Sequence, residues 1–197
     1  MRRLLVSAVA LVLTGAALAG CAADPLADQY RAGSNKDYIA GDGTVETYAP
    51  ANRKTPDAFS SKTDAGAAVS STDLSGKVTV LNFWYASCPP CRAEAPELEK
   101  LNREFTGDGV RFLGVNTRDE AGTASSFGAT FGLTYPSLID YRDAAVQLAF
   151  SAAIPPNAVP TTLVLDKKGR IAARILGELT APSTLETIIR DTVAETD

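Results

Sequence analysis

The stretch VTVLNFWYASCPPCRAEAPEL, residues 78–98, places two cysteines at the junction of an apolar run and a helical pattern. Residues 78–86 are almost continuously apolar and rich in β-branched and aromatic side chains, which is typical of a strand buried on both faces. Residues 88–105 have apolar side chains at helical spacing. A buried strand that leads directly into a helix, with Cys88 and Cys91 at the helix start, is therefore the expected centre of the domain.

The segments on either side predict an α/β domain built around this strand. Residues 58–71 suit two short strands that form an N-terminal β-hairpin around a turn at 64–66. The elements expected after the cysteines are a strand at 110–117, a weak helix at 119–133, an extended piece at 135–140, a short helix at 142–150, strands at 159–166 and 171–177, and a helix at 181–195. Parallel strands joined by a crossover helix and followed by a hairpin predict a mixed central sheet with helices on both faces.

Residues 1–20 resemble an export signal and are not expected to be part of the fold. A basic start, MRR, precedes an apolar stretch that is shorter than the about 20 apolar residues of a membrane span. The tetrapeptide LAGC, residues 18–21, resembles a bacterial lipobox, which implies cleavage before Cys21 and attachment of acyl chains to it. Each buried CH₂ group adds about 0.8 kcal/mol of membrane affinity, so two or three chains anchor firmly. An uncleaved anchor, or an ordinary signal with an incidental Cys21, is the alternative.

Residues 21–50 are expected to be a flexible tether, because they are rich in Gly, Asp and Ala and have no sustained periodicity. The expected organisation is a signal peptide at 1–20, a lipidated tether at 21–50 and one folded domain at 51–197. The domain would then be lipid-anchored in the cell envelope, on the outer face of the cytoplasmic membrane.

The composition excludes several classes of active site. The chain has 197 residues, a net charge of −4 and no histidine. A negative net charge provides no basic footprint, so no nucleic-acid partner is expected. The absence of histidine excludes Ser-His-Asp triads, Cys-His pairs and HExxH metal sites, and two cysteines alone make a poor zinc site. Neither a metal nor another cofactor is expected.

Two cysteines three positions apart can form a structural disulfide, half of a metal site, a nucleophile with a spare thiol, or a redox couple. A CxxC pair at the start of a helix, after a buried strand of a βαβ unit, is typical of a thioredoxin-like redox motif. The helix N-terminus stabilises an anion, and the thiolate is the attacking species in disulfide exchange. Cys88, at the helix start, is the predicted attacking cysteine. Cys91, one turn inside and too buried to attack a partner, is the predicted resolving cysteine.

Three segments together resemble the TlpA, ResA and DsbE family of thioredoxin-like, membrane-tethered bacterial proteins. They are VLNFWYASCPPCRAEAPEL, YPSLID and VPTTLVLDKKGRI, and the resemblance covers residues 50–195. It implies a thioredoxin-like fold and thiol–disulfide exchange outside the cytoplasm, often as a reductant for cytochrome c maturation and sometimes as an oxidant for secreted proteins. The implied partners are exported proteins with disulfides or thiols, and a membrane-bound thiol electron donor.

The same resemblance assigns the residues that would bind a substrate. Pro160 matches the proline that is cis in this fold and faces the disulfide, and Val159 before it would offer its main chain to a substrate strand. A trans proline that begins a strand is the alternative for Pro160. Trp84 is expected to be core and a wall of the site. Because Ser87 stands where many relatives have a tryptophan, Tyr85 would supply any aromatic cover.

Glu94, one helical turn after Cys91, matches an acidic residue that ResA-like proteins keep near the redox pair. A partly buried carboxyl beside two thiols would have a raised pKa and would relay protons during exchange. Asn82 stands where cytoplasmic thioredoxins have a buried acid, and it cannot take a proton, which favours Glu94 for this role. The alternative is a solvated helix glutamate, like Glu97 and Glu99.

The leading hypothesis is a reductant of disulfides in exported proteins. Pro89 and Pro90 lack N–H donors, so the Cys88 thiolate has fewer hydrogen bonds, which favours a reducing protein. An oxidant is the alternative, because the direction depends on the reduction potential relative to the partner. A peroxiredoxin is excluded, because Tyr85 and Leu81 occupy the Thr and Pro positions of its P-x-x-x-T/S-x-x-C pattern. A non-catalytic binding lipoprotein is a third hypothesis, which the intact cysteines disfavour.

Overall fold

The computed structural model describes residues 43–155 and 157–195, and the account below is confined to them. The predicted signal at 1–20, Cys21 and the tether as far as residue 42 lie outside the described residues. Within the described ranges, no helix is both long enough and apolar enough to cross a membrane.

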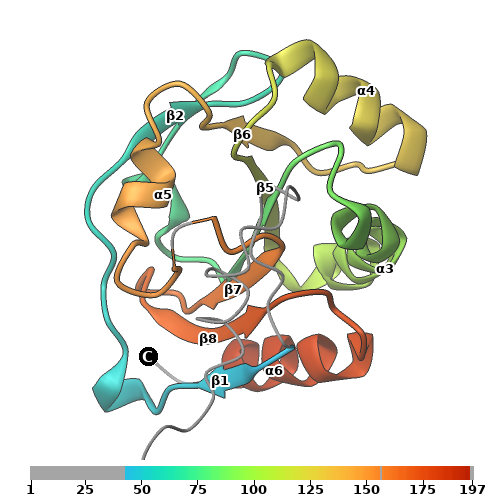
Figure 1. Cartoon of the computed structure of the whole chain (residues 1–197). Coiled ribbons are helices and arrows are strands. Elements are labelled where there is room, and N and C mark those ends of the chain that lie inside the picture. Colours follow the sequence, from blue (N-terminus) through green and yellow to red (C-terminus); the bar gives the residue numbers. More distant parts are fainter. Residues whose placement is uncertain (1–42, 156, 196–197) are drawn as a thin grey trace, which may run out of the picture. The chain divides into compact units, whose positions relative to one another are not determined.

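The described residues form a mixed six-stranded sheet with the strand order β1-β8-β7-β4-β5-β6 (Figure 1). Its strands are β1 (Val45–Thr47), β4 (Thr79–Trp84), β5 (Arg111–Asn116), β6 (Ser137–Ile139), β7 (Thr161–Leu165) and β8 (Ile171–Leu176). The central strand β4 pairs in parallel with β5 and antiparallel with β7. The thioredoxin-like arrangement predicted from the sequence is therefore confirmed, with the strand before the cysteines at the centre of the sheet.

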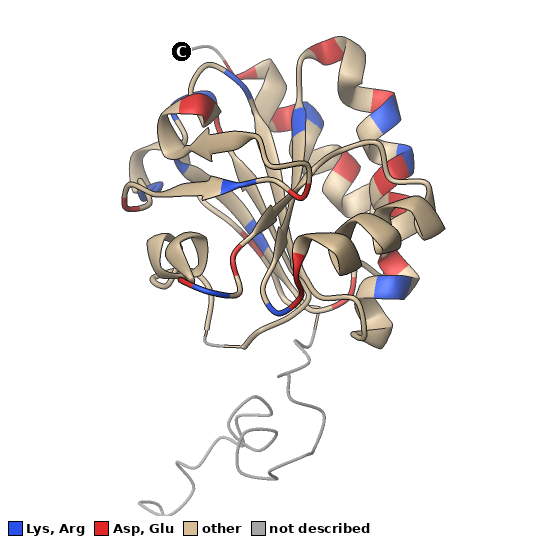
Figure 2. Cartoon of the chain, turned by 90° about the horizontal axis from the view of Figure 1, so that it is seen from above, with Lys and Arg blue, Asp and Glu red and all other residues tan. Residues whose placement is uncertain are grey.

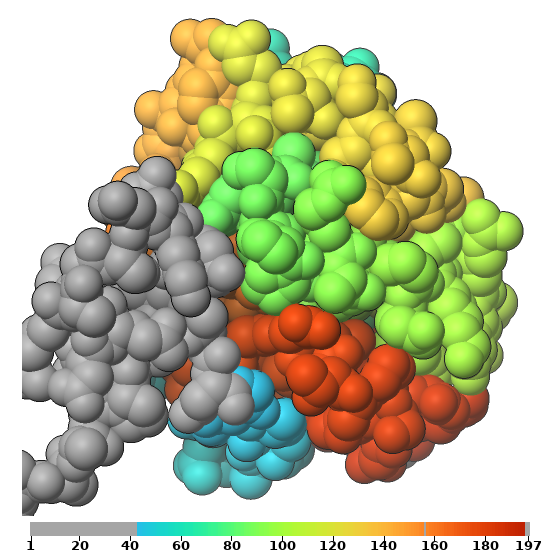
Figure 3. All heavy atoms as spheres, turned by 45° about the vertical axis from the view of Figure 1, so that its right-hand side comes forward, coloured from blue at the N-terminus to red at the C-terminus, as the bar shows by residue number. Residues whose placement is uncertain are grey.

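Helices cover both faces of the sheet, as predicted. They are α3 (Pro89–Phe105), α4 (Ala121–Phe131), α5 (Ala145–Ala149) and α6 (Pro182–Ala194), with short 3₁₀ turns η2 (Pro50–Asn52), η3 (Ser71–Leu74) and η4 (Thr106–Asp108). The helices α3 and α6 pack on one face. The helix α5 and the predicted hairpin, β2 (Ser60–Lys62) with β3 (Ala68–Ser70), lie over the other. In the space-filling view, α3 lies between α4 and α6 (Figure 3).

The strand β4 separates two apolar cores because its side chains alternate between the faces of the sheet. Leu81 and Phe83 lie in the core under α5, together with Phe150. Val80 lies in the core under α3 and α6, together with Leu98. Every residue of β4 is buried, which confirms a strand covered on both faces. Most charged residues lie on the helices and loops around these strands (Figure 2).

The folded domain begins earlier in the chain than the sequence predicts. Residues 45–47, expected to be tether, form the edge strand β1, in which Val45 pairs with Ile175 of β8. Just after this strand, the buried Arg53 guanidinium lies 3.2 Å from the Asp166 carboxylate. A strand this short has too little periodicity to be recognised, and its stability comes from pairing with β8 and not from its own sequence. The predicted end of the tether at residue 50 is therefore too late.

Candidate active site

A disulfide joins Cys88 to Cys91 at the start of α3. Cys88 is the N-cap of the helix, and its Sγ accepts a hydrogen bond from the Cys91 N–H at 3.3 Å. Proline is well suited to the first turn of a helix, where an N–H has no partner within the helix. Because Pro89 and Pro90 have no N–H, that of Cys91 is the first donor that the helix offers. This donor, together with the helix dipole, would stabilise a thiolate at Cys88.

Burial does not distinguish the two cysteines, contrary to the expectation from the sequence. Cys88 has 0% and Cys91 has 2% of its surface exposed. The burial of Cys88 comes from tertiary packing, which the spacing of the motif does not reveal. The assignment of Cys88 as the attacking cysteine therefore depends on its N-cap position, where the Cys91 N–H points at its sulfur.

An aromatic cluster surrounds the disulfide. Besides the cysteines, its buried members are Trp84, Tyr85, Ala95, Ala124, Phe127 and Val159. The Trp84 ring lies against Phe127, with ring centroids 4.1 Å apart. The Tyr85 ring lies under the Arg118 guanidinium, 4.6 Å from its carbon to the ring centroid. Trp84, predicted as core and a wall of the site, and Tyr85, predicted to supply any aromatic cover, thus both lie in the cluster around the disulfide. Their role in substrate binding stays a prediction.

Gly114 on β5 allows the Trp84 indole to reach across the sheet. The Trp84 Nε1–H donates a hydrogen bond to Ser137 Oγ on β6 at 3.2 Å. A Cβ atom at position 114 would lie 2.2 Å from that oxygen and 2.6 Å from the indole nitrogen. A glycine is therefore needed beneath this hydrogen bond, and it helps to hold one wall of the site in place.

The peptide bond between Val159 and Pro160 is cis, as predicted. Val159 belongs to the cluster around the disulfide, and 3% of its surface is exposed. The carbonyl of Pro160 accepts a hydrogen bond from the Gly177 N–H at 2.9 Å. Within the part of the chain that the structure describes, the main chain of Val159 forms no hydrogen bond. A main chain that lies beside the sulfurs and has no partner among the described residues is suited to pairing with an extended segment of another polypeptide.

Glu94 is buried, with 2% of its surface exposed, which contradicts the alternative of a solvated glutamate. Its Oε1 accepts from Asn82 Nδ2 at 2.7 Å, and its Oε2 accepts from the Leu179 N–H at 2.9 Å. Burial raises the pKa of Glu94 from its ordinary value of 4.5 to about 7, against the effect of these two hydrogen bonds. The nearby Glu178 carboxylate raises this pKa further.

Two members of the hydrogen-bond network around Glu94 were not foreseen from the sequence. Asn82 Nδ2 also donates to Thr162 Oγ1 at 3.1 Å, and the two residues are direct partners across β4 and β7. Thr162 follows Pro160 by two positions, so the period of a strand places it on the same face as that proline. The Leu179 N–H is a main-chain group, and no side-chain pattern identifies it.

The expectation that Glu99 is solvated is wrong. Its exposed fraction is 6%, and its carboxylate accepts hydrogen bonds from the Thr134 N–H at 2.8 Å and from Arg103 Nε at 2.5 Å. Burial acts to raise the pKa of Glu99, but these donors more than offset it and hold the pKa below its ordinary value. Glu97 is partly exposed. The loop that contains Thr134 covers Glu99, and this long-range contact is not encoded in the helical pattern.

A mixed sheet, a CxxC disulfide at the first turn of α3 and an adjacent cis-proline define a thioredoxin-like protein. The model of the family described as Redoxin matches residues 49–189, so the chain belongs to the Redoxin family. The thiol-disulfide oxidoreductase ResA of Geobacillus thermodenitrificans is 36% identical over 109 residues, which are 55% of this chain and 60% of that protein.

Solved structures agree with this family. A DsbF homologue from Corynebacterium diphtheriae is 33% identical, with a TM-score of 0.66 over 77% of this chain and 94% of that one. A secreted thiol-disulfide isomerase from Corynebacterium glutamicum is 30% identical, with a TM-score of 0.69 over 78% and 95% of the two chains. These relatives confirm the predicted resemblance to ResA- and DsbE-like proteins. The chain spans about 60% of the length of that ResA relative.

Proposed function

We propose that this protein is a thiol–disulfide oxidoreductase that reduces disulfides in exported proteins. The observation on which this depends most is the Cys88–Cys91 disulfide at the start of α3, with the Cys91 N–H directed at Cys88 Sγ. In the dithiol form, this arrangement stabilises a thiolate at the position that meets a substrate. The buried Glu94, on the same helix, supplies a proton acceptor.

The reaction consists of two exchanges of a sulfur–sulfur bond. The Cys88 thiolate attacks one sulfur of the substrate disulfide. A bond between Cys88 and that sulfur forms, the substrate disulfide breaks, and the second substrate sulfur leaves as a thiolate that takes a proton. Cys91 then loses its proton and attacks Cys88, which releases the first substrate sulfur as a second thiol. The substrate gains two electrons and two protons, the protein loses them, and the product is the Cys88–Cys91 disulfide that the structure contains.

Glu94 is the proposed acceptor of the Cys91 proton. It is three residues further along α3, so one helical turn brings the two side chains to the same face. A carboxyl with a pKa of about 7 is partly ionised at neutral pH and is therefore able both to take and to return a proton. Asn82 and the Leu179 N–H position its two oxygens.

Asn82 suits both protonation states of this acid. Its Nδ2 donates to the ionised carboxylate. When Glu94 is protonated, rotation of the Asn82 amide presents Oδ1 to the new O–H, and Thr162 Oγ1–H is then able to donate to the same oxygen. The rotated amide thus presents an acceptor to a proton on Glu94.

The helix start supports reduction as the direction of flow. Pro89 and Pro90 provide no N–H, so among the described main-chain groups only that of Cys91 donates to Cys88 Sγ. A less stabilised thiolate makes the dithiol a better electron donor, because strongly oxidising members stabilise their reduced form. An oxidant that installs disulfides is the second candidate, and the measured reduction potential separates the two. A potential near −120 mV, about that of DsbA, would reject the reductant.

The proposal places the protein and its substrates outside the cytoplasm. It is supported by the signal-like residues 1–20 and by residues 18–21, which resemble a lipobox and imply a lipid anchor at Cys21 and a tether. The related protein from C. glutamicum is described as secreted. A membrane-bound thiol donor would return the disulfide to the dithiol, and the resemblance to ResA-like proteins favours a role in cytochrome c maturation. In this proposal, the Val159 main chain pairs with the substrate segment beside Pro160.

Reduction of insulin by dithiothreitol, with and without the protein, tests the activity. The wild type should accelerate precipitation of the insulin chains, and Cys88→Ser should not. Equal rates for the two would reject the oxidoreductase and favour the non-catalytic binding lipoprotein. Cys91→Ser should instead accumulate a mixed disulfide with the natural substrate, which mass spectrometry of the trapped complex identifies.

A further inference from the structure

Two arginines lie beside the short stretch of main chain that leads into Cys88. The Arg118 guanidinium, from the loop after β5, lies over the Tyr85 ring, with its carbon 4.6 Å from the ring centroid. The Arg92 side chain, from the start of α3, donates from Nη1 to the Ala86 carbonyl at 3.3 Å. Both cations therefore contact consecutive residues that precede the proposed attacking cysteine.

Neither of these arginines forms an ion pair within the part of the chain that the structure describes. Apart from Arg111, the other described arginines do so: Arg53, Arg103, Arg142, Arg170, Arg174 and Arg190. Arg111 lies at the opposite end of β5 from Arg118, where it donates to the Asp73 carbonyl at 2.8 Å. The redox site is thus bordered by two cations that have no carboxylate partner among the described residues.

The acidic residues that follow Arg118 are engaged elsewhere. The Asp119 carboxylate accepts hydrogen bonds from the Ala86 N–H at 2.6 Å and from Asn116 Nδ2 at 2.9 Å. The Glu120 carboxylate pairs with Arg142 at 3.1 Å. The first turn of α3 contains no acidic residue, although a helix favours one there. This side of the site therefore keeps its positive charge.

Arg92 stands where a helix disfavours a cation. It is the fourth residue of α3, close to the end at which the helix dipole is positive, and its side chain reaches back to a carbonyl that precedes the helix. Its guanidinium lies 5.1 Å from the centroid of the Phe131 ring, which packs against the cluster around the disulfide. The cation at this position does not stabilise the helix through the dipole, so its presence is better explained by an anion that it binds.

Both guanidiniums are arranged to receive a carboxylate. An aromatic ring covers one face of each, and a guanidinium held in this way still presents its N–H donors at its edge, in the geometry that matches a carboxylate. Arg92 is exposed and Arg118 is partly exposed. Ser87 and Pro89, on either side of Cys88, are exposed as well. A polypeptide that approaches Cys88 from this side thus meets both cations.

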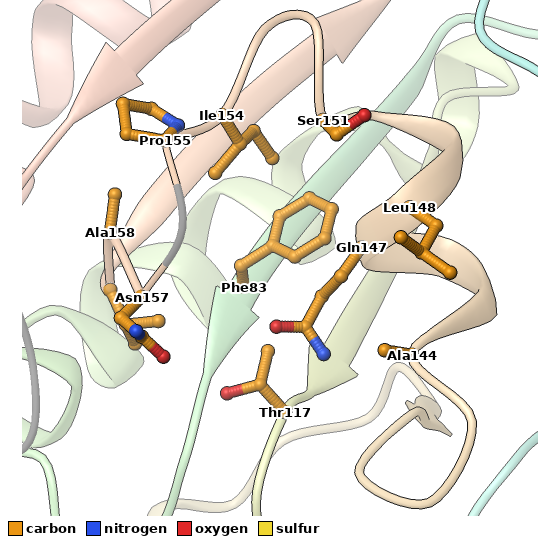
Figure 4. A pocket seen from close by; sticks show the side chains of 11 residues that line it. Phe83, Thr117, Ala144, Gln147, Leu148, Ser151, Ile154, Pro155, Asn157 and Ala158 are labelled. Carbon is orange, nitrogen blue, oxygen red and sulfur yellow. The ribbon is translucent and has the colours of Figure 1, made fainter.

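An uncharged cavity borders the site on the α5 side of the sheet. It has a volume of about 190 Å³, and Figure 4 shows the Phe83 ring between α5 and the segment before Pro160. Val159 belongs both to its lining and to the cluster around the disulfide. None of the described residues that line it is ionisable. A preference for charged substrates therefore has to come from the arginines and not from this cavity.

We infer that Arg92 and Arg118 bind acidic side chains of the substrate polypeptide, close in sequence to its reacting cysteine. This inference deepens the proposed function and depends on it. The chain as a whole has a net charge of −4, so a partner with a large negative charge would be repelled at a distance. The substrate class is therefore a polypeptide with Asp or Glu beside its cysteine, and not a polypeptide that is strongly acidic throughout.

Exchange with activated peptides tests this inference on the full-length protein in detergent. Each peptide has one cysteine, joined as a disulfide to 2-thiopyridine, in a neutral host sequence with Asp or the isosteric Asn on both sides of the cysteine. The Cys88 thiolate of the reduced protein forms a bond to the peptide sulfur, and the other sulfur leaves as thiopyridone, whose absorbance gives the second-order rate constant. Division by the rate constant with 2-mercaptoethanol, a neutral thiol, removes the intrinsic effect of Asp on the peptide.

The corrected rate constant should be about fivefold higher for the Asp peptide than for the Asn peptide, as expected of two exposed charge pairs. This ratio applies at an ionic strength of about 0.01 M, where the Debye length is about 30 Å. At about 1 M, where the Debye length is about 3 Å, the ratio should fall below about twofold.

Variants of the two arginines connect this preference to the site. Arg92→Gln and Arg118→Gln should each reduce the ratio to about twofold, and the double variant should reduce it to about one. A change in the reactivity of the Cys88 thiol affects both peptides equally and cancels in the ratio. The matched control is Arg111→Gln, which removes the same charge at the opposite end of β5 and should keep the fivefold ratio.

The outcomes separate this inference from the proposed function. Equal corrected rate constants for the Asp and Asn peptides would reject the acidic substrate while leaving the oxidoreductase intact. A preference that survives in the double variant, or that Arg111→Gln reduces as much, would also reject binding by Arg92 and Arg118. Release of thiopyridone that is no faster than with Cys88→Ser, for every peptide, would reject both proposals together.

Discussion

Glu94 and Glu99 lie on the same helix, less than two turns apart, and burial has opposite outcomes for them. Both are buried, with 2% and 6% of their surfaces exposed. The pKa of Glu94 is raised to about 7, whereas the pKa of Glu99 lies below its ordinary value. Removal of a carboxylate from water raises its pKa in both cases, so the difference has to come from the partners.

The partners of the two acids differ in charge. Glu99 receives hydrogen bonds from Thr134 and from a guanidinium, that of Arg103, which stabilise its ionised form. Glu94 has only neutral donors, the Asn82 amide and a main-chain N–H, and a like charge nearby. A buried carboxylate beside a cation stays ionised and has a structural role. A buried carboxylate with neutral donors titrates near neutral pH and is therefore suited to proton transfer.

The largest expected effect is that of Asn82→Asp, which places a second buried carboxyl beside Glu94. Two carboxyls would then face each other where Asn82 Nδ2 now lies 2.7 Å from Glu94 Oε1. Since two buried carboxylates this close cannot both ionise, the variant should lose about 4 kcal/mol of unfolding free energy at pH 8 and much less at pH 4. Urea unfolding at the two pH values measures this. A loss that is equal at both would show that Glu94 does not titrate.

The next largest effect is the pH dependence of the unfolding free energy that the titration of Glu94 causes. A carboxyl whose pKa is higher in the folded than in the unfolded chain binds its proton more readily when folded, so its contribution to stability is present at low pH and is lost as the pH rises from 4.5 to about 7. The loss should be about 3 kcal/mol, since one pH unit corresponds to about 1.4 kcal/mol. Glu94→Gln should lack this decrease, and identical urea-unfolding profiles from pH 4 to 8 would contradict the raised pKa.

A kinetic comparison sharpens the difference between the glutamates. Glu94→Gln keeps the shape of the side chain but removes the proton acceptor, so it should slow reduction of insulin by at least about tenfold at pH 7. Glu97→Gln and Glu99→Gln, on the same helix, should retain the wild-type rate. The pH profile of the rate should lose an inflection near pH 7 in Glu94→Gln alone. Similar slowing in all three variants would mean that α3 as a whole, and not the Glu94 proton, limits exchange.

The smallest effect is expected for Glu99→Gln, on the unfolding free energy. Its lowered pKa means that its contribution is present above the pKa of the unfolded carboxyl and is lost as the pH falls through the folded pKa. Glu99→Gln should therefore lose about 1 kcal/mol at pH 7, because the Arg103 partner is largely exposed, and almost nothing at pH 3. Thermal unfolding at both pH values checks this, and a loss that persists at pH 3 would argue against an ionic contribution.

Local patterns predicted the elements near the site well, for physical reasons. The apolar run became β4, and the segment after it became α3 with Cys88 as its N-cap. Both depend on the spacing of side chains along one segment and on the caps of a helix, which the chain itself displays. The cis bond before Pro160 was predicted from the resemblance to a family and not from the residue pattern.

The failures share a different cause. The strand β1, the burial of Cys88 and the burial of Glu99 all depend on segments that are distant in sequence. The pairing of β1 with β8 and the cover of Glu99 by Thr134 join positions more than thirty residues apart. No local period reports such contacts, so the tether was extended too far and Glu99 was expected in solvent.

The amino-acid sequence by itself was sufficient to predict a redox pair at the start of a helix. Two thiols at the start of a helix and the absence of histidine follow from residue identity and spacing alone. The amide of Asn82 is significant only through the resemblance to thioredoxins, which have an acid at this position. Only the tertiary structure decided which glutamate titrates near neutral pH, and only it brought Phe83, α5 and Val159 together around a cavity. The physical reason is that the reactivity of a thiol in disulfide exchange depends first on its residue type and on its position at the start of a helix. A pKa and a pocket, in contrast, depend on desolvation and on partners that only packing of distant segments supplies.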